Sequence, residues 1–193
     1  MKRFMAFLLT LALLMGTHAM LAQSKFGFEV RGGAAFATQD LGDADLNTGF
    51  GIEGMFDYRF MPHLGAYVGW GWNRFAADQS FAGVEADFEE TGYMFGLEFN
   101  HPIGTSSLAY YIRGGGIYNH IEVENKAGDI TDDSGHGLGW QAGVGLDIGL
   151  GDKWHIKPGV KYQSLSRELK VENVTTDVDL KYLSVGLGIA FRF

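Results

Sequence analysis

Charged side chains recur at alternate positions inside segments that are otherwise apolar or rich in glycine, and they are the groups of this sequence best placed to do chemistry. They comprise five acids and six bases: Glu29, Glu53, Asp57, Glu98 and Asp147, with Arg31, Arg59, Arg113, Lys157, Lys161 and Arg192. Such groups could line an ion-selective pore, or they could pair with one another and fill a narrow interior. Unpaired charges are costly in a confined space. Because the two signs nearly balance, the sequence favours a network of ion pairs.

The sequence gives less support for a metal site or a catalytic nucleophile than for these charged groups. The six histidines lie at scattered positions without the spacing of metal ligands: His18, His63, His101, His120, His136 and His155. The segments 43–47 and 129–133 carry the spaced polar residues that open a calcium loop, but neither has glycine at the sixth position or an acid at the twelfth. No serine accompanies His120 as a lipid-deacylating enzyme would need. The sequence therefore predicts no catalytic, cofactor-binding or metal site.

Strands must position the charges, because apolar residues alternate with small or charged ones. In the last segment, 182–193, large apolar residues occupy the odd positions, whereas Ser, Gly, Ala and Arg occupy even positions from 184 onward. An apolar outer face with a polar inner face is typical of a barrel in lipid. Seven more segments follow the same rule: 25–36, 49–60, 64–75, 91–100, 108–123, 137–150 and 154–169. The prediction is an all-β fold, an eight-stranded antiparallel up-and-down transmembrane β-barrel, which must close to pair its edges.

The connections alternate in length. Short turns are expected at 61–63, 101–107 and 151–153, and long polar loops at 37–48, 76–90, 124–136 and around 172–177. Counting residues from each short turn places Glu98 level with Arg113, and Asp147 level with Lys157, on adjacent strands. We expect these two pairs, with inward glycines leaving room for the long charged side chains. Most of the remaining acids fall in the long loops.

Residues 1–22 have a basic start, an apolar centre and a small-residue end, which predicts a cleaved signal peptide. The expected domain is then 23–193, a single barrel. The formal net charge is −8, and it becomes −10 without Lys2 and Arg3. An acidic chain is a poor ligand for phosphate backbones, so no nucleic-acid partner is expected. The chain has no cysteine and therefore no disulfide.

The chain ends on Phe193, with apolar residues at alternate positions before it: Leu187, Ile189 and Phe191. Together with the signal, the eight strands and the alternating connections, this ending resembles the eight-stranded outer-membrane β-barrel family of the OmpA transmembrane-domain and OmpX type, often called porin-family proteins. The resemblance implies insertion in the bacterial outer membrane, with the termini and short turns in the periplasm and the long loops at the cell surface. It also implies that these four residues form the signal that the barrel assembly machinery reads.

The expected role is structural or surface-interacting, with a lumen closed by ion pairs and acidic loops next to outer-membrane lipid and lipopolysaccharide. The chain is expected to be a monomer, and the sequence identifies no ligand for its loops. Two alternatives remain at this point. The first is a narrow porin-like channel for small solutes, and the second is a lipid-modifying outer-membrane enzyme. Neither a cofactor nor a catalytic residue is expected.

Overall fold

The computed structural model describes residues 25–42, 44–80, 83–125, 127–171 and 174–193, with side chains described except in 78–85 and 169–176. The predicted signal peptide, residues 1–22, lies outside the described residues. No helix among the described residues is both long and apolar enough to cross a membrane.

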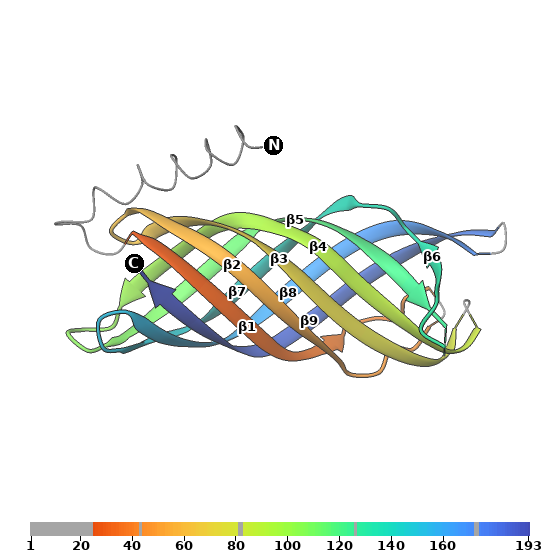
Figure 1. The fold of residues 1–193 in the computed structure, drawn as a ribbon, viewed down its shortest axis with the longest axis horizontal. Coiled ribbons are helices and arrows are strands. Elements are labelled where there is room, and N and C mark those ends of the chain that lie inside the picture. The colour runs from red at the N-terminus through yellow and green to blue at the C-terminus, as the bar shows by residue number, and fades with distance from the viewer. Residues whose placement is uncertain (1–24, 43, 81–82, 126, 172–173) are drawn as a thin grey trace, which may run out of the picture.

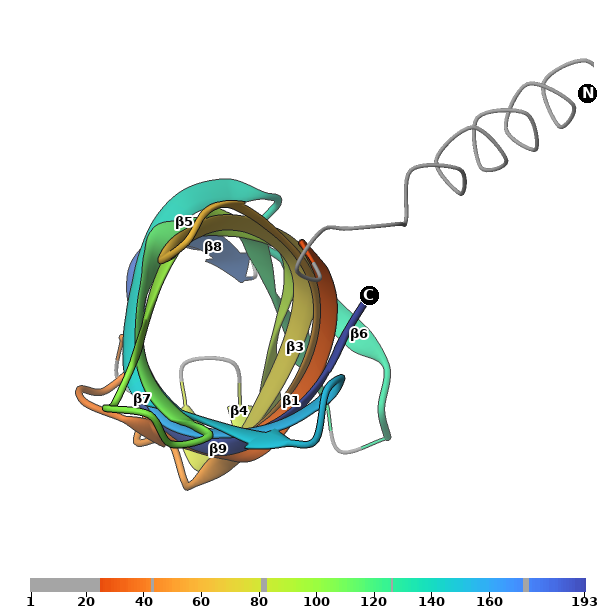
Figure 2. The same ribbon diagram turned by 90° about the vertical axis from the view of Figure 1, so that its left-hand side faces the viewer.

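The strands form one closed antiparallel barrel (Figures 1 and 2). Eight of them follow each other around the wall and β9 pairs back to β1, so the predicted eight-stranded barrel is confirmed. A ninth, short strand, β6, pairs only with β5. The bounds are β1 Phe26–Ala37, β2 Gly49–Met61, β3 Leu64–Ser80, β4 Gly83–Pro102, β5 Leu108–Glu124, β6 Ile130–Asp133, β7 Gly137–Leu150, β8 Trp154–Val171 and β9 Val174–Arg192.

The seam between β1 and β9 brings the two ends of the barrel chain together. The backbone N–H of Phe26 donates to the Phe193 carbonyl at 3.2 Å, and the Phe193 N–H donates back at 2.9 Å. Farther along, Gly33 lies opposite Gly186. A Cβ on Gly33 would stand 2.3 Å from the Val185 carbonyl oxygen, so this close approach of the strands requires glycine.

Several strands are longer than predicted. The interpretation of 76–90 as a loop is wrong, because β3 and β4 remain paired through Ala77 and Ala86 and beyond. Likewise β8 and β9 pair as far as Val171 and Val174, and β6 lies within the expected loop 124–136. The reason is that the acids in these stretches alternate with small or apolar residues, which continues the ladder. These extensions and the long β1–β2 connection lie at the right-hand end in Figure 1, opposite the start of β1 and the C-terminus. We call this the outer end.

Near the short turns, large apolar side chains cover the outside of the wall. Val30, Phe56 and Val68 are more than half exposed, whereas their neighbours Glu29 and Tyr67 point inward and are buried. This half matches the predicted faces of the strands.

The outer end has the opposite arrangement, which the sequence reasoning missed. An apolar cluster fills its interior, and we call it the outer core: Ala35, Phe75, Ala77, Ala86, Phe88, Ile117, Ile121, Val123, Leu165, Val178 and Leu180, with Leu41, Ala44 and Leu46 from the β1–β2 connection. Leu41 and Ala44 are completely buried. The prediction that 37–48 is a polar surface loop is therefore wrong for these apolar residues, which turn inward and remove their surface from water.

Candidate functional site

Four charged side chains meet at the centre of the lumen. Glu29 on β1, Glu98 on β4, Arg113 on β5 and Lys157 on β8 form this central cluster, and none is more than 8% exposed. The guanidinium Nη2 of Arg113 lies 2.5 Å from Glu98 Oε2 and 2.8 Å from Glu29 Oε2. Lys157 Nζ lies 3.0 Å from Glu98 Oε2 and 3.1 Å from Glu29 Oε2. Each acid contacts both bases, so the cluster is balanced in charge.

Aromatic rings and one further base extend the central cluster. Arg31 Nη2 donates to Glu29 Oε1 at 2.8 Å and to the Tyr111 hydroxyl at 2.7 Å. The Arg113 guanidinium lies 5.1 Å from the Tyr67 ring centroid and 5.3 Å from that of Tyr111, within the range of cation–π attraction. The sequence reasoning missed Tyr111 as an inward residue. Tyr111 lies two residues before Arg113 on β5, so the two side chains point to the same face, and this spacing could have identified it.

Toward the short turns, a second group of charges surrounds Asp147. Its Oδ1 lies 2.6 Å from His155 Nδ1, and its Oδ2 accepts a hydrogen bond from Asn100 at 2.8 Å. Arg192 forms an ion pair with Asp57 and lies 3.6 Å from Asp147. The expected Asp147–Lys157 pair is therefore wrong. Although these residues are close on adjacent strands, the long lysine side chain carries its ammonium group to the two carboxylates of the central cluster.

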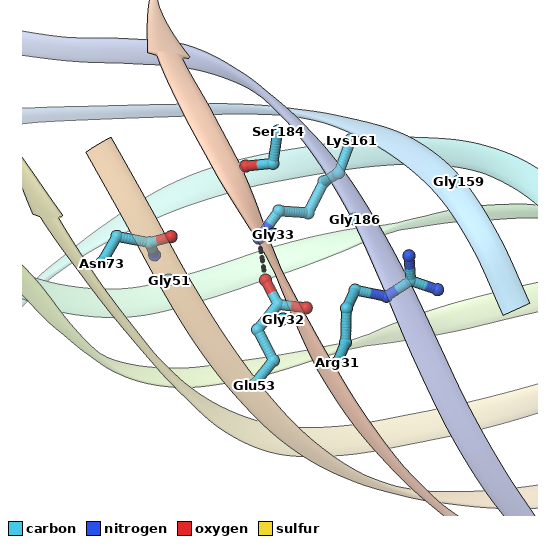
Figure 3. A pocket seen from close by; sticks show the side chains of 10 residues that line it. All are labelled: Arg31, Gly32, Gly33, Gly51, Glu53, Asn73, Gly159, Lys161, Ser184 and Gly186. Atoms are coloured by element: carbon cyan, nitrogen blue, oxygen red, sulfur yellow. Dashed lines mark hydrogen bonds and ion pairs between the residues drawn. The ribbon is translucent and has the colours of Figure 1, made fainter. Parts of the chain in front are cut away.

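On the outer side of the central cluster, Lys161 forms an ion pair with Glu53 (Figure 3). Lys161 also donates a hydrogen bond to Gln163 Oε1 at 2.9 Å. Two cavities next to this pair each have a volume of about 20 Å³, which is room for about one water molecule. Arg59 is the exception among the predicted network residues. It has no ion pair within 4 Å among the residues the structure describes, although Asp57 lies two residues away on the same face of β2.

A layer of hydrogen-bonded polar side chains separates the charged clusters from the outer core. Glu90 is fully buried there and accepts hydrogen bonds from four side chains. The distances are 2.5 Å from Gln163, 2.6 Å from Asn119, 2.6 Å from Tyr182 and 3.4 Å from Asn73. The sequence reasoning placed Glu90 in a loop and missed this site. The observed arrangement satisfies a buried carboxyl group without a directly bonded cation.

The four residues of the expected assembly signal lie on one face of the last strand. Leu187 and Ile189 are half exposed on the outside of the wall. Phe193 follows directly after β9, is 54% exposed, and has its ring centroid 6.2 Å from that of Phe191 and 6.3 Å from that of Phe26. The four side chains therefore form a continuous apolar surface near the chain ends.

Solved structures with the same fold come from bacterial outer membranes. Neisserial surface protein A matches with a TM-score of 0.63 and 14% identity, covering 88% of this chain and 97% of that one. OprG from Pseudomonas aeruginosa matches with a TM-score of 0.59 and 16% identity, covering 89% of this chain and 98% of that one. Escherichia coli outer membrane protein W matches with a TM-score of 0.56 and 15% identity, covering 90% of this chain and all of that one. At these identities the likeness concerns the fold. No curated protein sequence matches the chain.

Residues 7–193 match the family described as Outer membrane protein beta-barrel domain. The match spans nearly the whole chain, including every strand of the barrel. The closed wall, its apolar outside and its charged inside agree with it. The chain therefore belongs to the outer membrane protein beta-barrel domain family.

Proposed function

We propose that this protein is a non-enzymatic, monomeric outer-membrane barrel whose role is structural or surface-interacting, and whose lumen is closed to solutes. One observation carries the proposal, namely the central cluster. Its two acids and two bases come from four strands and contact one another across the full width of the interior. A narrow eight-stranded interior is about wide enough for side chains alone, so this cluster blocks the passage.

The outer core supports the same proposal. Any solute that passed the central cluster would next meet the polar layer around Glu90 and then tightly packed apolar side chains, including Phe75 and Phe88, which are completely buried. The cavities beside Lys161 each have room for only about one water molecule. Two barriers of different chemistry therefore lie in series, and a narrow porin-like channel is the less favoured function.

Planar-bilayer recording on the purified protein tests the closed lumen. The wild-type protein is expected to give little or no stable conductance. Glu98→Gln leaves the two bases with one carboxylate fewer and is expected to loosen the cluster and raise conductance. In Glu98→Gln with Arg113→Gln, the pair of Glu29 and Lys157 remains balanced, so destabilisation should be smaller than in the single variant. The control is Lys181→Gln, which lies on the outer wall.

Steady ion-selective conductance in the wild-type protein, insensitive to both substitutions, would overturn the proposal and favour the channel.

The outward side chains at the outer end suggest the kind of surface the protein presents. They are largely acidic and include Asp87, Glu89, Glu122 and Glu124. Ail of Yersinia pestis, a barrel of the same fold with a TM-score of 0.51 and 15% identity over 88% of this chain, was crystallised with the heparin analogue sucrose octasulfate. A polyanion of that kind would be repelled by the acids here. We propose that this end instead meets cationic partners, or lipopolysaccharide through divalent cations.

The orientation is part of the proposal and has a direct test. An epitope tag inserted at Asp129 should be labelled on intact cells, whereas a tag at Gly104 should not. Both sites are exposed turns that tolerate insertions. Surface labelling at Gly104 would reverse the orientation.

We also propose that Phe193 acts with Leu187, Ile189 and Phe191 in recognition by the barrel assembly machinery. Its ring is half exposed, so deleting it should remove little packing. Deletion is expected to lower the folded, heat-modifiable fraction in cells and to leave refolding in detergent nearly normal. Equal losses in the two settings would contradict this role.

A further inference from the structure

A cluster of possible metal ligands lies on the outer wall, away from the lumen. Its members are His120 and Glu122 on β5 and Asp133 at the end of β6, and we call it the rim cluster. One ligand atom from each lies within 4.8 Å of the other two. His120 and Asp133 are 13 residues apart, and β6 brings them together by pairing Asp133 with Glu122. Sequence spacing therefore gave no signal of this site.

The distances suit a small transition-metal ion. His120 Nδ1 lies 2.9 Å from Asp133 Oδ1 and 3.8 Å from Glu122 Oε1. Zinc lies about 2.0 to 2.2 Å from nitrogen and oxygen ligands, so tetrahedral geometry separates two ligand atoms by about 3.4 Å. The two observed distances lie on either side of that separation. Shifts of about half an ångström would bring each of these two pairs of atoms to that separation, and all three ligand atoms already lie within 4.8 Å of one another.

The scaffold holds Asp133 in place. The Gly135 N–H donates to Asp133 Oδ1 at 2.8 Å, in a turn where Gly135 has φ of 63°. Ser134, the next residue, connects this turn to β5. Its N–H donates to the Ile121 carbonyl at 2.9 Å, and its hydroxyl accepts from the Ile121 N–H at 2.8 Å. Arg167 donates to the Ser134 carbonyl at 2.9 Å. Outer contacts of this kind orient ligands and raise metal affinity.

The surroundings favour a cation and leave a way in for it. Glu122 lies opposite Glu89 on β4 and shares a face with Glu124, so the wall beside the cluster is acidic. Asp133 lies at the end of β6, beside this acidic wall. Its side chain is 49% exposed, which leaves one side of the cluster open to water.

A second histidine covers the site. The ring of His136 lies 4.3 Å from that of His120, with the two planes 16° apart. The same ring lies 5.1 Å from Tyr118 and 6.4 Å from Tyr93. These tyrosines are exposed on the outside of the wall. The rim cluster therefore lies where the apolar outer face gives way to the acidic one.

We propose that the rim cluster is a binding site for a divalent transition-metal ion such as Zn²⁺. His120, Glu122 and Asp133 supply three ligands, and the open side leaves a position for water or for a ligand atom from another molecule. An imidazole with two carboxylates suits zinc and related ions, whereas calcium takes six to eight oxygen ligands. The site is independent of whether the lumen conducts.

The test is calorimetric titration of the folded, purified barrel, carrying no polyhistidine tag, with Zn²⁺. One ion should bind per chain, and His120→Ala or Asp133→Asn should each weaken binding by at least about tenfold. Glu122→Gln should weaken it as well. The matched control is His63→Ala with His101→Ala, because these rings lie 4.8 Å apart at the opposite end of the barrel. Heat-modifiable migration on gels checks that each variant is folded.

Co²⁺ gives a second readout that does not depend on the rim variants folding. Bound Co²⁺ should produce a visible absorption band in the wild-type protein and in the His63→Ala, His101→Ala variant. Loss of the band in that variant would overturn the proposal. So would the absence of Zn²⁺ binding, or binding that persists unchanged in folded His120→Ala and Asp133→Asn.

Discussion

Two parts of β9 place their side chains in opposite ways. Between Leu183 and Ile189, the odd residues are apolar and point outward, while Ser184, Gly186 and Gly188 point inward. Between Val178 and Tyr182, the apolar even residues are buried inside and Asp179 and Lys181 lie outside. The alternation has a period of two throughout. The even residues face inward in both parts, and what changes is the kind of residue on each face.

The difference shows how one ladder serves two surroundings. Near the short turns the wall is apolar outside, as lipid requires, and its interior holds balanced charges. At the outer end the wall is acidic outside, as water allows, and its interior holds an apolar core. The polar layer around Glu90 marks the change inside, and Tyr118 and Tyr93 mark it outside. The two interiors should therefore respond differently to substitution.

The largest effect is expected in the charged interior. Arg113→Met removes one partner from Glu98 and Glu29 and leaves buried carboxylates undercompensated. Such a loss costs about 3 to 5 kcal/mol, which is to be measured by urea unfolding from lipid vesicles with tryptophan fluorescence.

The matched control is Arg74→Met, whose side chain pairs with Asp87 and Glu89 on the outer wall and is 38% exposed. Its cost should stay below about 1 kcal/mol. Equal losses for the two arginines would remove the distinction between interior and wall.

The next effect concerns the outer core. Leu41→Ala deletes a completely buried side chain of the β1–β2 connection. The expected loss is about 2 kcal/mol, at the low end for such truncations because a loop can shift to fill the space. Limited proteolysis should also cut faster within residues 38–48. Ile130→Ala, whose side chain is 56% exposed on β6, is the control. An unchanged cleavage rate in Leu41→Ala would mean that this connection does not depend on the outer core.

A smaller effect is expected at the boundary. Tyr182→Phe removes the hydroxyl that donates to Glu90 Oε2 at 2.6 Å, while three other donors remain. A single hydrogen bond contributes about 1 kcal/mol net, and this is the expected loss in the same unfolding assay. Tyr162→Phe serves as the control because Tyr162, on β8, lies on the outside of the wall, whereas Tyr182 lies inside it. A loss as large as that of Arg113→Met would make the boundary, and not the central cluster, the sensitive layer.

The smallest effect is expected on the outer wall. Hydrogen bonds from Lys181 and then Ser166 lower the pKa of Asp179 below its ordinary value of 3.8. The associated stabilisation is therefore present above about that pH and is lost as the pH falls through the lowered pKa. Asp179→Asn should be slightly destabilising at neutral pH, with a difference from wild type that vanishes in acid. A difference that grows in acid would contradict the sign of this shift.

The membrane-facing half could be predicted from the sequence because a period of two assigns every side chain to a face. Glu98 and Arg113 are a favourable case, since they lie directly opposite each other on β4 and β5. The contacts of Lys157 could not be predicted in this way. Its ammonium group contacts carboxylates on other strands across the lumen, and such contacts depend on the diameter and tilt of the barrel.

The outer half could have been predicted in part. Adjacent apolar residues at Tyr182 and Leu183 break the alternation, and this change of phase is the signal that the wall leaves the membrane. Leu41 carries no such signal, because a loop has no period to assign its side chains. The rim cluster had none either, since the four-residue β6 that positions Asp133 is too short for a pattern.

The seam between β1 and β9 has a consequence for the order of the chain. Phe26 and Phe193 are hydrogen-bonded neighbours, so the wall is a ring in which no strand is structurally first. Linking the two ends and opening the chain at Gly104, an exposed turn, would give a circular permutant with the same strand neighbours. Such a chain would no longer end on Phe193, which would separate the contribution of that residue to the fold from its contribution as a terminus.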